Sequence, residues 1–167
     1  MTDIQYTSVL TADYRKDLEN LLFFNPEQKR FRSDIVRSIE RCGCPEIVMR
    51  NGHLHVGVTK YLDAQNLFAL MSDRQHPRLV GSIIYFRESR ANLVVAHVAV
   101  VPPYTMLQSR GEVPLALELL NHVMVVAQRV KGIETVELPY SRGKPRRIPI
   151  AGGPEWIALM ATYRRLT

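Results

Sequence analysis

The sequence predicts an α/β protein of one domain, spanning residues 1–167, in which helices cover a β-sheet. Three observations predict this class. Residues 93–101 form an apolar run with few polar side chains, as expected for a central strand covered on both faces. A long apolar helix is predicted at residues 114–130, with one polar stripe along it. Short strand patterns at residues 66–71 and 79–86 flank a polar loop and supply more of the sheet.

The first part of the chain is predicted to hold one strand and two helices. Residues 4–9 read as a short strand, and Thr11 can cap a helix whose leucines recur at helical spacing. A second helix start follows at Asn25, with Pro at its first position and Gln at its third. The apolar stripe of that helix consists of Phe31, Ile35, Ile39 and Cys42. Gly43 is a natural stop for it.

The remaining elements follow from turn and strand signals. Residues 46–49 and 54–58 flank Asn51-Gly52, a pair typical of a tight hairpin turn. After the long helix, residues 135–138 read as a strand. A loop rich in Gly, Pro and Arg is then predicted up to Pro154, and residues 155–166 are predicted to close the chain as a helix.

Composition favours an ordered, soluble protein. Hydrophobic residues make up 46% of the chain and charged residues 23%, which is ordinary for a globular domain and argues against disorder. No run approaches the roughly 20 apolar residues that cross a bilayer, and the first residues lack the pattern of a secretion signal. Two cysteines separated by one residue cannot staple a fold. We therefore expect a cytoplasmic protein without a membrane partner.

The net charge of +6 is concentrated near the C-terminus. From Ser141 onward, Glu155 is the one acid, opposite six basic residues: Arg142, Lys144, Arg146, Arg147, Arg164 and Arg165. Such a basic region favours anionic partners, including nucleic acid, although a solvated loop explains it equally well. The run at 142–147 lacks interleaved aromatics, so stacking on bases is not indicated, and nucleic acid is not the favoured partner.

A candidate phosphate site lies between the apolar strand and the long helix. The strand at 93–101 leads through Pro102-Pro103 to the Gly-containing segment 108–113, and the helix starts at Pro114. Free backbone N–H groups and the helix dipole converge at such a helix start, where they bind anions. The alternative is an ordinary strand–loop–helix connection that turns at Gly111.

The order of elements resembles the GNAT superfamily of N-acetyltransferases. The motifs that carry the resemblance are Val9-Leu10-Thr11-Ala12-Asp13, Phe68-Ala69 followed by Val80-Gly81-Ser82-Ile83, Val98 to Pro102, and Gln108-Ser109-Arg110-Gly111-Glu112-Val113. Each motif alone is weak, and their order across residues 4–166 makes the case. The resemblance implies a central, mixed and mostly antiparallel sheet flanked by helices. It also implies transfer of an acetyl group from acetyl-CoA to an amine acceptor.

The same resemblance implies where the cofactor lies. The backbone of Val98, Ala99 and Val100 would hold the pantetheine arm. The pyrophosphate would meet the loop formed by Gln108, Ser109, Arg110, Gly111, Glu112 and Val113. Free amides are the groups that such a loop offers, and Arg110 would add charge.

Three residues are candidates for catalysis. His97 lies one residue from the cofactor-binding strand positions and is a candidate general base, with a packed strand histidine as the alternative. Glu88 is a rival base, with an exposed turn residue as the alternative. Tyr163 resembles the tyrosine with which the family protonates the departing thiolate, with a core tyrosine as the alternative.

Departures from the family leave other functions open. Val113 stands where the family has Gly or Ala, the link before Gln108 is longer than usual, and no closing strand pair is obvious after the last helix. The extra hairpin at 46–58 or a second subunit would fill the vacant sheet edge, so a homodimer is plausible. A catalytically inactive ligand- or partner-binding module is the main alternative to an enzyme, and a basic nucleic-acid-binding protein is a weaker one.

A metal site is not predicted. Cys42-Gly43-Cys44 and His53-Leu54-His55 hold residue types that bind zinc, but one residue between cysteines is shorter than the usual gap. Alternate histidines merely share one face of a strand.

Overall fold

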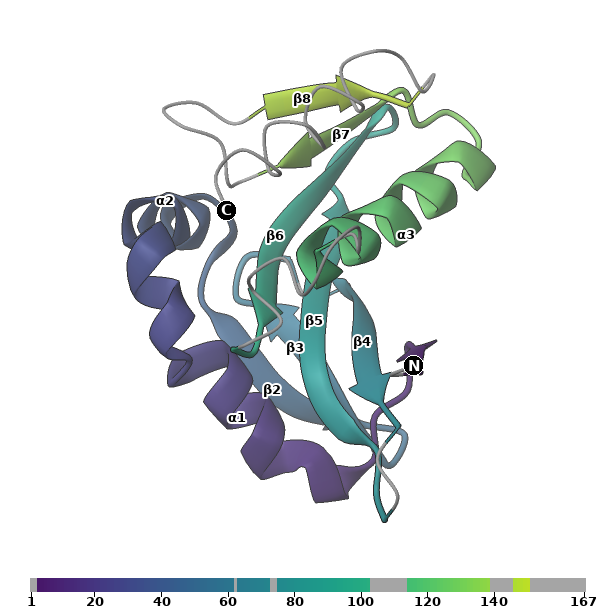
Figure 1. Cartoon of the computed structure of the whole chain (residues 1–167). Coiled ribbons are helices and arrows are strands. Elements are labelled where there is room, and N and C mark those ends of the chain that lie inside the picture. The colour runs from purple at the N-terminus through teal and green to yellow at the C-terminus, as the bar shows by residue number, and fades with distance from the viewer. Residues whose placement is uncertain (1–2, 62, 73–74, 103–113, 139–145, 151–167) are drawn as a thin grey trace.

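A computed structural model describes residues 3–61, 63–72, 75–102, 114–138 and 146–150 (Figure 1). The elements in chain order are β1 (Ile4–Thr7), η1 (Ala12–Tyr14), α1 (Arg15–Phe23), η2 (Pro26–Phe31), α2 (Arg32–Cys42), β2 (Pro45–Arg50), β3 (His53–Val58), β4 (Gln65–Met71), β5 (Arg78–Arg87), β6 (Asn92–Val100), α3 (Leu115–Arg129), β7 (Thr135–Leu138) and β8 (Arg146–Pro149). The prefix η marks 3₁₀ turns. No helix in the described part of the chain is both long and apolar enough to cross a membrane.

The main sheet has six strands in the order β1-β4-β5-β6-β7-β8. Every neighbouring pair is antiparallel except β6 and β7, which run parallel. The sheet is therefore mixed and mostly antiparallel, and helices flank it, as the sequence resemblance implies. The hairpin of β2 and β3 forms a separate two-stranded sheet.

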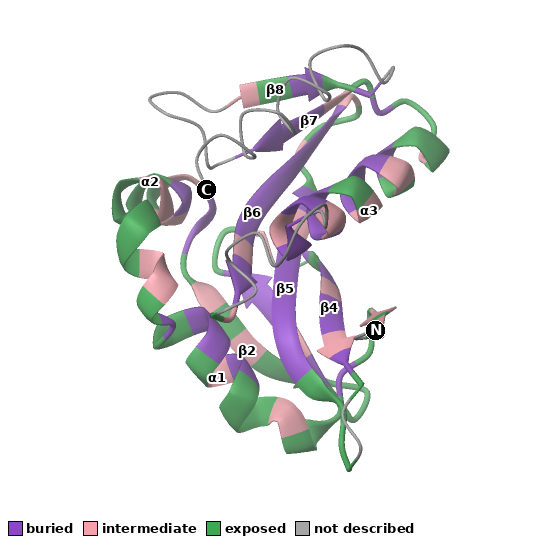
Figure 2. Ribbon diagram, in the orientation of Figure 1, coloured by how far each residue is buried: buried purple, intermediate pink, exposed green. Residues whose placement is uncertain are grey.

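Two hydrophobic cores cover the two faces of the sheet. On one face α3 packs against β5, β6 and β7 (Figure 1). On the other face α1, α2 and the hairpin cover the same central strands, and Phe68 and Ile84 lie in that core. Figure 2 shows the result: β5 and β6 are almost wholly buried, while the outer sides of the helices are exposed. A strand buried on both faces reads as a continuous apolar run, which is why β6 is evident in the sequence.

Local sequence signals correctly predicted the hairpin turn, the end of α2 and the cap at Asn25. The hairpin turn has positive φ angles at Asn51 (50°) and Gly52 (79°), as the Asn-Gly pair predicts. Gly43 ends α2 with a φ of 91°, a backbone conformation that favours glycine. A Cβ at this position would also lie 1.9 Å from Thr59 Oγ1, so a larger residue would clash. The Asn25 side chain accepts a hydrogen bond from the Glu27 N–H at 3.1 Å, as a cap does.

Several expectations differ from the structure, among them the predicted cap at Thr11, whose side chain makes no capping hydrogen bond. The helix predicted to start at Asn25 begins with 3₁₀ turns, and the α-helix starts only at Arg32. Residues 146–149, predicted as loop, form β8 and pair antiparallel with β7 along its open edge. The hairpin does not fill that edge. The Gly, Pro and Arg content of this segment favoured a loop, but Pro is tolerated at the end of an edge strand such as this one.

Candidate functional site

The candidate site lies where β6 loses its partner strand. β6 and β7 pair over Asn92–Val94 and Thr135–Glu137, and we call this junction the β6–β7 fork. Beyond Val94, β6 continues to Val100, and no strand of the described residues pairs with it on that side (Figure 1). The fork therefore leaves six residues of a central strand with one open edge.

The register of β5 and β6 determines which peptide groups face the open edge. The Val101 N–H donates to Val80 O at 2.9 Å, so Val101 points toward β5. Groups alternate along a strand, so the N–H and C=O of Val98 and Val100 point away from β5. They face the open edge.

Two buried side chains close part of this edge. Asn25 Nδ2 donates to Val100 O at 2.8 Å, and Ser38 Oγ donates to Ala96 O. Asn25 and Ser38 are 8% and 7% exposed. They satisfy the carbonyls that flank Val98, a half-buried residue whose own N–H and C=O lie between them. Because unsatisfied buried peptide groups are costly, Val98 is the position on this edge where a ligand gains most by hydrogen bonding.

His97 lies beside this edge, at a β-bulge. The pairing with β5 passes from His97 to Val95 and skips Ala96. The imidazole is 4% exposed, and its Nε2 lies 3.4 Å from Gln28 Nε2 of η2. Burial lowers the pKa of His97 to about 4. The ring is therefore neutral at pH 7.

Glu88 is held by two partners at the other end of β6. Arg41 Nη2 lies 2.6 Å from its Oε1, and Asn92 Nδ2 donates to its Oε2 at 3.1 Å. The hydrogen bond from Arg41 lowers the pKa of Glu88 below its ordinary value. A carboxylate held in this way is a weaker base than a free one.

Glu137 is a functional candidate that the sequence analysis missed. It belongs to β7 at the fork and is 2% exposed. Its carboxylate pairs with Arg41 of α2 and with Arg147 of β8, where the distance from Arg147 Nε is 3.1 Å. Asn92 Nδ2 also lies 3.4 Å from Oε2. The one signal in the sequence is an acid inside a four-residue apolar strand, and its partners come from distant segments.

A small cavity of about 30 Å³ lies at the fork, under α2. Its wall consists of Arg37, Ser38, Arg41, Cys42, Val94, Val95 and Glu137. This volume is about that of one water molecule, so the cavity as it stands does not admit a substrate. It marks where α2 does not fully cover the fork.

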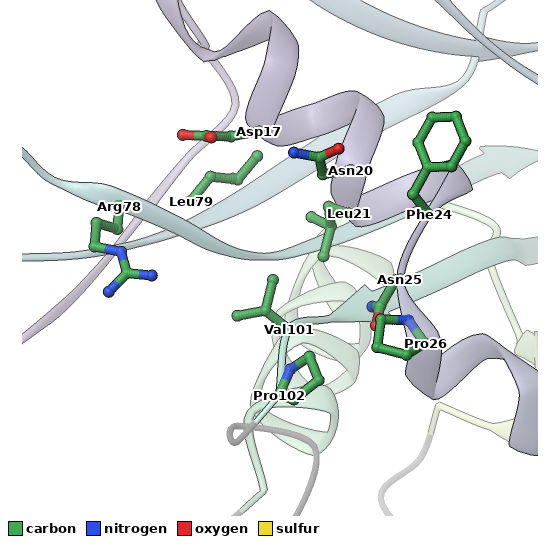
Figure 3. A pocket seen from close by; sticks show the side chains of 10 residues that line it. All are labelled: Asp17, Asn20, Leu21, Phe24, Asn25, Pro26, Arg78, Leu79, Val101 and Pro102. Atoms are coloured by element: carbon green, nitrogen blue, oxygen red, sulfur yellow. The ribbon is translucent and has the colours of Figure 1, made fainter.

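A larger pocket, of about 240 Å³, lies between α1 and the far end of β6. We call it the α1 pocket, and Figure 3 shows the residues that line it: Asp17, Asn20, Leu21, Phe24, Asn25, Pro26, Arg78, Leu79, Val101 and Pro102. Asn25 belongs to its wall and also caps the β6 edge, so the pocket and the edge are neighbours.

The structure places only some of the predicted site residues. Val98, Ala99 and Val100 lie together on β6, and His97 is adjacent to them. Glu88 lies at the fork, near the opposite end of the strand. Residues 108–113 of the predicted phosphate loop and Tyr163 lie outside the described residues. Among those described, no cluster of three or more His, Cys, Asp or Glu side chains is arranged to hold a metal ion.

Comparison with known proteins gives one distant structural likeness. No family model matches the chain, and no curated protein matches it. A solved structure of an acetyltransferase from Streptococcus agalactiae 2603 is similar to this chain with a TM-score of 0.49 and 19% sequence identity. The match covers 81% of this chain and 71% of the other. A likeness this distant carries no argument about family or activity, so the functional proposal must come from the site.

Proposed function

We propose that this protein transfers an acetyl group from acetyl-CoA to an amine. The observation that carries the proposal is the open edge of β6, where the Val98 peptide groups face outward between two carbonyls capped by Asn25 and Ser38. A ligand that contains amides in an extended chain can pair with such an edge as a strand would. The pantetheine arm of coenzyme A is a chain of this kind.

The donor is proposed to lie along β6 from Val98 to Val100. The pyrophosphate would then meet the segment 108–113 at the predicted helix start, where Arg110 adds positive charge. α3 begins at Leu115, immediately after this segment, as the proposal requires. The assignment of the pyrophosphate to residues 108–113 comes from the sequence.

The chemistry needs a neutral amine and a protonated leaving group. The amine nitrogen attacks the thioester carbonyl, the C–N bond forms and the C–S bond breaks. The amine loses a proton and the thiolate gains one. Of the two predicted bases, His97 lies beside Val98, next to the proposed donor, whereas Glu88 lies at the fork and is held by Arg41 and Asn92. Tyr163 stays the proposed proton donor to the thiolate.

The proposal is tested by acetyl-CoA binding and by turnover. We expect calorimetry to show binding to the wild type and little to a variant carrying Arg110→Glu and Gly111→Trp. Arg129→Glu, at the exposed end of α3, is the control with the same change of charge. Hydrogen exchange at the Val98 amide should slow when acetyl-CoA is added, because a ligand amide or carbonyl then occupies this position.

The outcomes are distinct. Absence of binding by the folded wild type at millimolar acetyl-CoA would reject the proposal. Binding with slowed exchange at Val98, but without acetylation of any amine in a panel, would replace the enzyme by a binding module at the same site. Acetylation that survives in the double variant would move the cofactor away from residues 108–113.

A further inference from the structure

The α1 pocket joins charges of both signs to an apolar surface. Asp17 and Asn20 lie one helical turn apart on α1, and Arg78 begins β5 on the other side of the hollow (Figure 3). Leu21 and Val101 form part of the wall beyond them. A concave surface that combines a few polar groups with apolar side chains is typical of a small-molecule site.

The two charged side chains have no other role in the described structure. Within the described residues, neither Asp17 nor Arg78 takes part in an ion pair or a side-chain hydrogen bond, although five other arginines form ion pairs. Both side chains are exposed at the mouth of the pocket. They are available to a ligand.

Two hydrogen bonds hold α1 against the strands beside the pocket. Asn25 Nδ2 holds the end of α1 to Val100 O at 2.8 Å, and Tyr14 Oη donates to Pro77 O at 2.9 Å. The second bond ties the start of α1 to the residue before Arg78. A preformed site avoids the entropic cost of ordering its own loops when it binds.

The size of the α1 pocket and the arrangement of its lining residues limit which ligands it can bind. The volume of about 240 Å³ equals the share of roughly eight water molecules, below the range for drug-sized ligands. In Figure 3, Asp17 and Arg78 lie toward one end, whereas Phe24 and Pro26 lie toward the other. The ligand is therefore small, with both charges at one end and an apolar group at the other.

We propose that the α1 pocket binds a free amino acid with an apolar side chain. Its ammonium group pairs with Asp17 and donates a hydrogen bond to the Asn20 amide oxygen, and its carboxylate pairs with Arg78. Its side chain lies against Val101 and contacts Phe24, which is 75% exposed. The pocket adjoins the proposed cofactor edge and shares Asn25 with it, but the proposed binding does not depend on acetyl transfer.

The experiment compares three probes that differ in charge. L-leucine carries both charges, 4-methylpentanoate lacks the ammonium and 3-methylbutylamine lacks the carboxylate. Each is titrated into the full-length protein and followed by backbone NMR shifts of residues 17–26 and 78–79. We expect L-leucine to bind roughly tenfold or more tightly than either partner probe, because each charge-assisted hydrogen bond contributes about that much.

Two variants and two controls identify the residues. Asp17→Asn should abolish the preference for L-leucine over 4-methylpentanoate, and Arg78→Gln should abolish the preference over 3-methylbutylamine. Asp13→Asn and Arg129→Gln make the same changes at exposed positions outside the pocket and should leave all three affinities unchanged. All four positions are exposed, so the variants are expected to fold.

Three results would overturn the proposal. These are no shifts at the pocket with L-leucine up to about 10 mM, equal affinity for the three probes, or shifts centred away from α1 and the start of β5. None of them bears on acetyl-CoA binding at β6, which is measured without these probes. Failure of the amino-acid site and failure of the acetyltransferase proposal are therefore distinguishable.

Discussion

At the scale of single residues, the polar groups that matter most are those that the fold buries. His97 and Glu137 are 4% and 2% exposed, in a protein whose other charged side chains lie mainly at the surface. The fold treats the two differently. His97 is kept neutral by burial, whereas Glu137 forms ion pairs with two arginines. Each of these two environments leads to a testable prediction.

His97 should make the protein less stable as the pH falls. Its pKa is about 4 in the folded state and 6.5 when exposed, so between these values the unfolded chain binds the proton and the folded protein does not. The free energy of unfolding should drop by about 3 kcal/mol between pH 7 and pH 4 because of this group. Urea unfolding of the wild type and His97→Gln across this range measures it. The variant should show a shallower slope, while His53→Gln, at an exposed strand end, should match the wild type.

The His97 environment also constrains a catalytic role. A base with a pKa of about 4 is unprotonated throughout the neutral range, so its titration cannot limit the rate there. If acetyl transfer is found, its rate should rise with pH as the acceptor amine loses its proton, with no step near 6.5. A step near 6.5 that disappears in His97→Gln would show that the ring is hydrated in the working complex.

Glu137→Gln should destabilise the protein by about 2 kcal/mol. Breaking a fully buried pair costs 3–5 kcal/mol, but Arg41 and Arg147 are 30% and 62% exposed, so water compensates part of the loss. Urea titrations with Glu134→Gln, an exposed acid beside the same strand, provide the comparison. A loss below about 0.5 kcal/mol, the usual effect of a surface change, would mean that Glu137 does not hold the fork together.

At the scale of elements, the open edge of β6 is finished by side chains instead of a strand. α2 contributes Ser38 and the end of α1 contributes Asn25, each to one carbonyl. The sequence predicted Asn25 as a helix cap, and the structure confirms this, but its second bond to β6 was not predictable. The residues are 75 positions apart, and nothing local in the sequence reports such a contact.

The two functions of Asn25 can be separated by substitution. Asn25→Asp keeps the oxygen that accepts from the Glu27 N–H and removes the donor to Val100 O, whereas Asn25→Ala removes both. We expect Asn25→Ala to cost about 2–3 kcal/mol, from a lost cap and an unsatisfied buried carbonyl. Thermal or urea unfolding should show that Asn25→Asp is also destabilising, because its carboxylate faces the Val100 carbonyl. Equal stability of Asn25→Asp and the wild type would show that the bond to β6 contributes nothing.

At the scale of the whole molecule, the elements that could be predicted from the sequence are those with long apolar runs. β4, β5, β6, α3 and β7 were predicted close to their bounds, because burial on one or both faces imposes a pattern that is visible in the residues. The fork was not predicted. Arg41, Glu88 and Glu137 come from three distant segments, and their ion pairs exist only after folding. The α1 pocket was missed for the same reason, since its walls come from α1, the start of β5 and the end of β6.

β8 is the clearest failure of local reasoning. Its four residues include two arginines and a proline, a composition typical of loops, and one apolar side chain. That side chain, Ile148, is fully buried in the core beneath α3, and its strand partner is Val136. The burial of Ile148 through long-range strand pairing outweighs the weak strand propensity of the other three residues of β8.

Ile148 therefore provides a direct test of the sheet order. Ile148→Ala should lower the free energy of unfolding by about 2–4 kcal/mol, as large-to-small changes in a core do. Arg146→Ala, on the same strand but half-exposed, should cost less than about 1 kcal/mol. The measurement is urea unfolding of both variants beside the wild type. If Ile148→Ala were as mild as Arg146→Ala, residues 146–149 would be the loop that their composition suggests, and β7 would be the edge of the sheet. A large loss of stability in Ile148→Ala alone would support the sixth strand. In a solvated loop, the Ile148 side chain would make no core contacts for the substitution to remove.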